Sequence, residues 1–161
     1  MNYWMRCALQ EGDKARLIGE VPIGAVVLKD DQIIGVGHNL RETSNQATTH
    51  AEMAAIAMAN RYLNNWRLTD CDLYVTVEPC PMCAGAIVLS RLRHVYYGTP
   101  DPKAGAAGSL MNILQDERLN HQTELTAGVL GEACQHQMQQ FFRELRQKRK
   151  RHSRKPKQNK E

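Results

Sequence analysis

The sequence has no apolar run long enough to cross a membrane. Runs such as residues 53–59 cover only seven residues, whereas a membrane-spanning helix needs about 18 or more. The first fourteen residues also lack the unbroken apolar stretch of a secretory signal, because Arg6, Glu11 and Asp13 interrupt them. We therefore expect a cytoplasmic protein that is not inserted in a membrane.

The composition is also not extreme in its hydrophobic or charged fraction. The 161 residues are 42% hydrophobic and 24% charged, which excludes a wholly disordered or fibrous chain and is typical of one globular domain. The cysteines number five, and a reducing compartment disfavours structural disulfides. Paired thiols in such a protein are better interpreted as metal ligands or redox groups.

The charge is unevenly distributed along the chain. Residues 143–161 hold ten of the 21 Lys and Arg residues beside two acids, so this segment carries +8, the remainder −4 and the whole chain +4. A basic end on an acidic body is typical of binding to a polyanion, most often nucleic acid. The alternative is a solvated tail that only aids solubility. We expect residues 147–161 to form a basic, partly disordered tail.

Hydrophobic periodicity predicts alternating strands and helices. Helices are expected at residues 3–17, 50–63 and 81–91 and from residue 134 onward, and strands at 21–28, 32–37, 72–77, 94–98 and 124–129. The first two strands form a predicted hairpin. Residues 99–120 are expected to be mostly loop, with a turn of helix near 111–114. This order predicts an α/β sheet covered by helices.

Two short segments predict a metal site. His50 and Glu52 begin one expected helix, and Cys80 and Cys83, three residues apart, begin the next. Thiolates on one helix face, near the positive end of the helix dipole, suit a metal ion. With His50 they make three ligands, which leaves one tetrahedral position of Zn²⁺ open for water. Glu52 points in another direction and is better placed to move protons. This order of residues is the signature of zinc deaminases.

Two other interpretations of the Cys-x-x-Cys segment remain open. A thioredoxin-like redox pair explains neither His50 nor Glu52. A closed structural zinc site needs a fourth ligand, and no candidate lies at close motif spacing; the candidates are Cys7, Cys71, Cys134, His38, His94, His121 and His136.

These segments together resemble the cytidine deaminase superfamily, and within it the bacterial tRNA adenosine deaminases. The resemblance covers roughly residues 3–146 and rests on YWMR at 3–6, VPIGAV at 21–26, HAE at 50–52, LYVTVEPC at 73–80, MCAGA at 82–86, GAAGS at 105–109 and FFR at 141–143. It implies a zinc-dependent deaminase domain over residues 1–146, with a three-layer, helix-covered five-stranded mixed sheet of the cytidine deaminase type. It also implies one catalytic zinc per chain, a homodimer, and hydrolytic conversion of the wobble adenosine of a tRNA anticodon to inosine by zinc-activated water.

The resemblance also assigns roles to single residues. His50, Cys80 and Cys83 correspond to the zinc ligands, and Glu52 to the group that shuttles protons. Asn39 falls where the family has an asparagine that contacts the base, although it also suits a turn after a strand.

Two further positions are implied to bind substrate. Asp101 matches an aspartate near the backbone of the flipped nucleotide, but here Pro100 and Pro102 flank it and depart from the family pattern. Phe141 and Phe142 have the spacing of core residues. We expect at most one of them, Phe142, to contact RNA.

Two rival functions follow from the same residues. A deaminase of free guanine, cytosine or a nucleotide could use the same zinc site, but it has no need of a basic tail, which suits a phosphate surface. An RNA-binding protein with structural zinc has no use for Glu52 beside an open coordination position.

Overall fold

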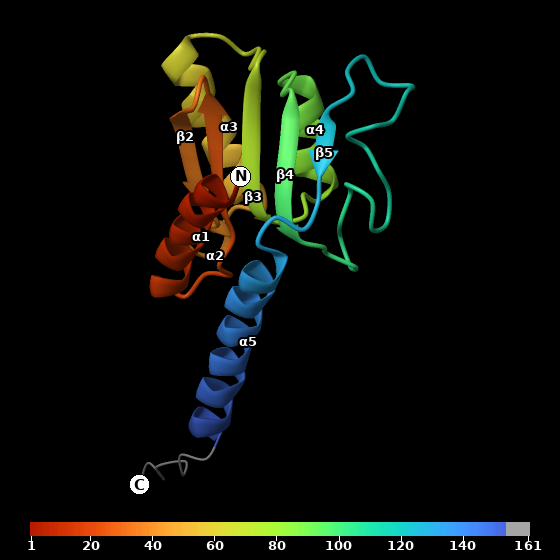
Figure 1. The fold of residues 1–161 in the computed structure, drawn as a ribbon. Helices are drawn as coiled ribbons and strands as arrows, with labels where there is room; N and C mark the ends of the chain where they lie inside the picture. Colours follow the sequence, from red (N-terminus) through yellow and green to blue (C-terminus); the bar gives the residue numbers. More distant parts are fainter. Residues whose placement is uncertain (154–161) are drawn as a thin grey trace, which may run out of the picture.

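The structure, a computed structural model, describes residues 1–153. Its centre is a five-stranded mixed sheet in the order β2-β1-β3-β4-β5 (Figure 1). The strands are β1 (Gly24–Lys29), β2 (Gln32–His38), β3 (Cys71–Val77), β4 (His94–Thr99) and β5 (Glu124–Thr126). β1 pairs antiparallel with β2 and β3, whereas β3, β4 and β5 are parallel. The predicted fold class and the predicted hairpin are confirmed.

The hairpin turn has a simple local cause. Asp30 and Asp31 join β1 to β2, and both have positive φ angles, of 49° and 58°. A two-residue turn with two positive φ values matches the right-handed twist of the strands that it connects. Aspartate tolerates this conformation better than most residues do.

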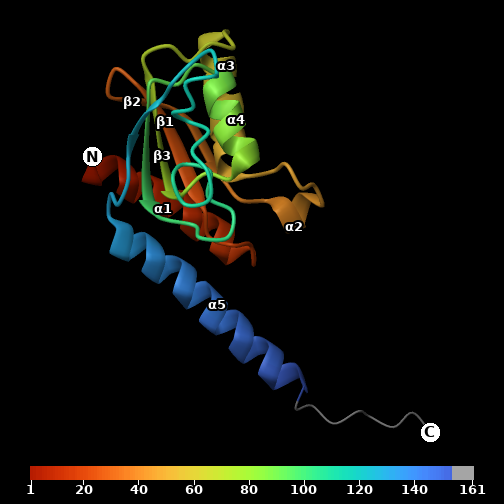
Figure 2. The ribbon, with the colours of Figure 1, turned by 90° about the vertical axis from the view of Figure 1, so that its right-hand side faces the viewer.

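Helices cover both faces of the sheet. α3 (Ala51–Leu63) and α4 (Pro81–Leu89) lie side by side on one face, and α1 (Asn2–Leu17) lies on the other (Figure 2). α3 approaches β2 so closely that a Cβ atom on Gly35 or Gly37 would lie 2.2 Å from a backbone oxygen of the helix. These glycines let α3 pack against the strand, and this contact sets the position of the helix N-terminus.

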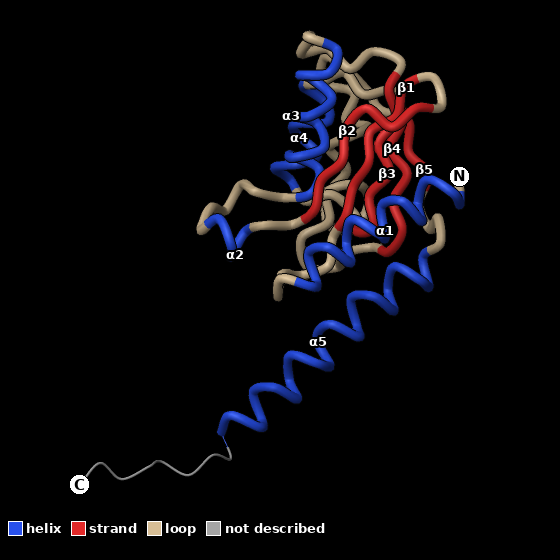
Figure 3. Tube along the Cα trace, turned by 90° about the vertical axis from the view of Figure 1, so that its left-hand side faces the viewer, coloured by secondary structure: helices blue, strands red, loops and turns tan. Residues whose placement is uncertain are grey.

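The last helix, α5 (Gly131–Ser153), docks at one end and then leaves the body of the protein (Figure 3). Near its start, Gln137 donates to the backbone oxygen of Leu9 (2.9 Å) and to Asp13 (3.0 Å) on α1. Residues 146–153 are all exposed. The first seven residues of the expected tail are therefore helical here, and residues 154–161 lie outside the described part of the chain.

One local prediction was wrong, and one short element was missed. Residues 111–114 form no helical turn; the loop is instead closed by a bridge between Ala107 and Asn112. A short helix, α2 (Arg41–Ser44), follows β2 and was not predicted, because four residues are too few to show a helical period. No helix among residues 1–153 combines the length and apolar character that spanning a membrane requires.

Candidate active site

Three metal-ligating side chains meet where two helices begin. His50 caps the N-terminus of α3, and Cys80 caps that of α4, with Cys83 in the first turn. The Nδ1 atom of His50 lies 3.6 Å from each of the two sulfurs. The three ligand atoms lie within 4.8 Å of one another. The structure therefore brings together the three residues that the sequence singled out.

Their spacing fits a zinc ion. Tetrahedral bonds of about 2.0–2.1 Å to nitrogen and about 2.3 Å to sulfur place these atoms about 3.6 Å apart, as they are in this structure. Within residues 1–153 no fourth His, Cys, Asp or Glu joins the group. Three ligands leave one coordination position for water, which is the arrangement of a catalytic site.

The two thiols differ in acidity in the metal-free protein. The Cys83 thiol donates a hydrogen bond to Cys80, and together with a bond from His50 this lowers the pKa of Cys80 to about 4. The same bond and burial raise the pKa of Cys83. Cys80 is therefore the more acidic of the two thiols, and this favours the thiolate form that a metal ion binds.

Glu52 lies beside the ligands but is not one of them. It belongs to the first turn of α3, is only 4% exposed and lines the same cavity as His50. Burial raises the pKa of Glu52 to about 7. A carboxyl group with such a pKa can both take up and release a proton near neutral pH, as general acid–base catalysis requires.

The cavity above these residues is small. It has a volume of about 190 Å³, below the roughly 300–1,000 Å³ of pockets for drug-sized ligands. It therefore suits a single planar base better than a whole nucleotide. Its lining, besides His50, Glu52 and Cys80, is formed by Val21, Ile23, Asn39, Arg41, Ala51, Val77, Glu78, Asp101 and Ala104.

Asn39 directly follows β2, and its side-chain amide forms hydrogen bonds within the protein. Its Nδ2 atom donates to the backbone oxygen of Val21 (3.3 Å) and to the carboxylate of Glu20 (3.5 Å). Its Oδ1 atom accepts from the backbone nitrogen of Arg41 (3.2 Å). The residue thus organises the turn after the strand and also lines the cavity.

Asp101 also lines the cavity, from the loop after β4. Its Oδ1 atom accepts from the backbone nitrogens of Lys103 (3.0 Å) and Ala104 (3.2 Å), which stabilises the turn. Its own backbone nitrogen donates to Glu78 (2.9 Å). The position of Asp101 therefore depends on a carboxylate at the end of β3.

That carboxylate holds most of the loop. Glu78 is 3% exposed, and it accepts from the backbone nitrogens of Ala107 and Ser109 (3.0 Å each) and from the Ser109 hydroxyl. Burial alone would raise the pKa of Glu78, but the hydrogen bonds from Ser109, Asp101 and Ala107 keep it below its usual range. Gly105 must be glycine, because a Cβ atom there would lie 2.3 Å from this carboxylate.

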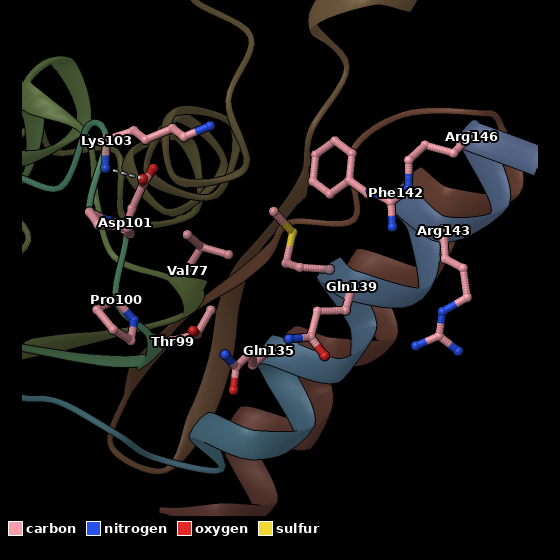
Figure 4. Close-up of a pocket in the computed structure, with 12 residues that line it drawn as sticks. Val77, Thr99, Pro100, Asp101, Lys103, Gln135, Gln139, Phe142, Arg143 and Arg146 are labelled. Atoms are coloured by element: carbon pink, nitrogen blue, oxygen red, sulfur yellow. Dashed lines mark hydrogen bonds between the residues drawn. The ribbon is translucent and has the colours of Figure 1, made fainter. Parts of the chain in front are cut away.

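A wider groove adjoins the cavity. It measures about 840 Å³ and lies between the loop after β4 and α5 (Figure 4). The groove and the cavity share Val77 and Asp101 in their linings. Three cations line it, Lys103, Arg143 and Arg146, and none of them forms an ion pair with another residue of the described chain.

The two phenylalanines of α5 have different surroundings. Phe142 is 39% exposed and lines the groove, whereas Phe141 is 7% exposed and belongs to the core. Only the Phe142 ring of the pair therefore lines the groove, and Phe142 is the one that we expected from the sequence to contact RNA.

Sequence reasoning assigned no role to two buried carboxylates. Glu20 precedes the VPIGAV segment and Glu78 lies inside LYVTVEPC. Each is an acid among apolar strand residues, and buried acids are rare unless they are paired. That signal was available, but the groups that hydrogen-bond to them lie 19 to 31 residues away in the sequence.

Comparisons with known proteins agree with this geometry. The family model of MafB19-like deaminases matches residues 1–146. The chain is 54% identical to the tRNA-specific adenosine deaminase of Bacillus subtilis (strain 168) over 91% of each chain. It is similar to a solved structure from a study of A-to-I editing by tRNA:A34 deaminases at the wobble position of transfer RNA, with a TM-score of 0.82, 39% identity, and coverage of 85% of this chain and 99% of that chain. It is also similar to a guanine deaminase from Bacillus subtilis, with a TM-score of 0.58 and 40% identity, over 61% of this chain and 63% of that chain.

Proposed function

The chain belongs to the MafB19-like deaminase family, and from this premise we propose that it hydrolytically deaminates adenosine to inosine at the wobble position of a tRNA anticodon. The observation that carries the proposal is the pairing of two spaces: a cavity of base size opens beside a larger groove lined by three cations. A free base needs only the cavity. A polynucleotide needs both, because one base must leave its stack while the neighbouring phosphates stay outside.

His50, Cys80 and Cys83 would hold one zinc ion per chain, which when bound activates a water molecule for attack on the base. Glu52 takes the proton from that water, delivers it to the ring nitrogen N1 of adenine, and assists departure of the amino group as ammonia. Its position in the buried cavity, two residues after His50, supports this role.

The remaining predicted residues bind and orient the substrate. Asn39 contacts the base from one wall of the cavity, and Asp101 contacts the flipped nucleotide from the other. Phe142 offers a ring face to a flanking base, since stacking on aromatic side chains is a common mode of RNA recognition. The cations of the groove contact phosphates.

We also propose that the chain forms a homodimer through α3 and α4. Residues 81–89 of α4 carry no charge, Leu89 is 69% exposed, and Gly85 has open space beside it. A second copy of the chain would cover this apolar surface. Sedimentation analysis of Leu89→Asp, which should shift the protein toward monomer, tests the assignment.

We also propose that the protein acts in the cytoplasm, because its proposed substrate is tRNA.

One assay tests the proposed reaction. The protein is incubated with total bacterial tRNA and, separately, with adenosine, cytidine, cytosine and guanine. Inosine in the digested tRNA is the expected result. Conversion of a free base or nucleoside with no inosine in tRNA would overturn the proposal in favour of a small-molecule deaminase.

A further inference from the structure

A buried carboxylate beside the cavity has no role in the chemistry described so far. Glu20 lies between α1 and β1 and is 1% exposed. It accepts a hydrogen bond from the backbone nitrogen of Thr43 and another from the Nδ2 atom of Asn39. Asn39 directly follows β2, and Thr43 lies in α2. The carboxylate therefore holds both ends of the segment that carries Asn39 and Arg41, and both of these residues line the cavity.

We propose that Glu20 is a positioning residue, which fixes the amide of Asn39 in one orientation and thereby sets how the substrate base is held. The inference rests on the proposed function, because it takes Asn39 to be the residue that contacts the base. Glu20 itself is not among the residues that line the cavity, so it acts through Asn39.

The chemistry of the pair defines the orientation. An ionised carboxylate can only accept hydrogen bonds, so the NH₂ group of Asn39 must face it. A rotation of the amide by 180° would place Oδ1 against the carboxylate and would leave the backbone nitrogen of Arg41 without its acceptor. Both changes oppose the flip. The amide is therefore set before the substrate enters, which reduces the ordering cost of binding.

The charge of Glu20 is maintained by its surroundings. Burial opposes ionisation, but hydrogen bonds from Thr43 and Glu42 keep the pKa of Glu20 below its usual range. A glutamine of the same shape would lose this selectivity, because its side chain can face Asn39 with either an oxygen or an NH₂ group. Glu20→Gln thus removes the constraint on the amide with little change in volume.

A double-mutant cycle with Asn39 tests the proposal. The four proteins are the wild type, Glu20→Gln, Asn39→Ala and the double variant, and the readouts are kcat and KM on an anticodon stem-loop, zinc content and Tm. We expect Glu20→Gln to lower kcat/KM by about 10- to 100-fold, the range for loss of a hydrogen bond to a charged group. In the Asn39→Ala background the same change should cost less than about twofold. Glu117→Gln changes an exposed carboxylate far from this segment that forms no ion pair among the described residues, so it is the control and should keep wild-type activity.

Additive losses in the cycle would overturn the inference, since Glu20 would then act without Asn39. A second measurement applies to the wild-type protein and does not depend on the variants folding. The side-chain amide protons of Asn39 should exchange with water more slowly than those of exposed asparagines, and exchange as fast as in an exposed asparagine would also overturn it. Absence of inosine in tRNA treated with the wild-type protein would instead overturn the proposed function.

Discussion

Glu52 and Glu78 line the same cavity, and the two residues are only 4% and 3% exposed, but their pKa values shift in opposite directions. Burial raises the pKa of Glu52 to about 7. Glu78 is subject to burial too, but hydrogen bonds from Ser109, Asp101 and Ala107 outweigh it and lower its pKa. The protonation of each carboxyl group thus depends on the balance between burial, which dominates at Glu52, and hydrogen-bond donors, which dominate at Glu78.

The difference in pKa gives the two carboxyl groups different roles at one site. A carboxyl group that titrates near neutral pH can exchange protons with water and substrate. One that stays ionised, with its oxygens occupied by hydrogen-bond donors, cannot; it holds a loop in place instead. The loop that Glu78 holds carries Asp101 and forms one wall of the cavity.

The largest effect is expected from Glu52→Ala. The variant should lose about 10²- to 10⁴-fold in rate, and more if the carboxyl group acts in several steps. It should keep its zinc and bind tRNA, because Glu52 is not a metal ligand in this arrangement. Elemental analysis and stopped-time assays measure both properties. Cys83→Ser provides the contrast, since it should lose zinc together with activity. Loss of zinc from Glu52→Ala would show instead that the carboxylate holds the metal.

Glu78→Gln should act mainly on stability. The variant keeps the size of the side chain but removes the charge that four donors share, which we expect to cost about 2–4 kcal/mol in the free energy of unfolding. Denaturant unfolding measures this cost. The rate should fall less than in Glu52→Ala, because no proton passes through Glu78. A rate loss as large as that of Glu52→Ala, with unchanged stability, would show that the two carboxylates do not have separate roles.

The two groups should also respond to pH in opposite ways in the zinc-free protein. The folded-state pKa of Glu52 is raised from 4.5 to about 7, so its contribution weakens the fold as pH rises through that window. The folded-state pKa of Glu78 is lowered, so its stabilisation is complete above the unfolded-state value and is lost as pH falls through the folded-state value. Tm measured against pH for the wild type, Glu52→Gln and Glu78→Gln tests both signs. Each variant should remove only its own part of the pH dependence.

The smallest effect on the reaction rate is expected from a deletion at the C-terminus, far from both carboxylates. Deletion of residues 148–161 removes exposed helix and chain beyond the described residues, and no core residue. The fold, the zinc and the rate on a saturating stem-loop should change little. RNA affinity should weaken, and the slope of log affinity against log salt should become shallower by about 3 if roughly half of the eight deleted cations contact phosphate. An unchanged slope would indicate a tail that only aids solubility.

The local pattern of the chain was sufficient for most of the fold and for the metal centre. Short β-branched and apolar runs predicted the five strands, apolar residues at helical spacing predicted the long helices, and the i, i+3 spacing of Cys80 and Cys83 predicted two ligands on one helix face. These predictions need only residues that are close in sequence, because helical and strand periods repeat within a few positions. The turn expected near residues 111–114 was wrong for the same reason: its structure depends on a bridge within a loop and not on a period.

The tertiary structure alone decided which of the other residues do what. Phe141 and Phe142 are adjacent and identical in type, yet only packing of α5 against the sheet shows which ring faces the groove. The sequence marks Glu20 and Glu78 only as acids in apolar surroundings, and their roles arise because donors from other segments of the chain converge on them. A hydrogen bond depends on the distance and direction between two groups, and for residues far apart in the chain only the folded structure defines these.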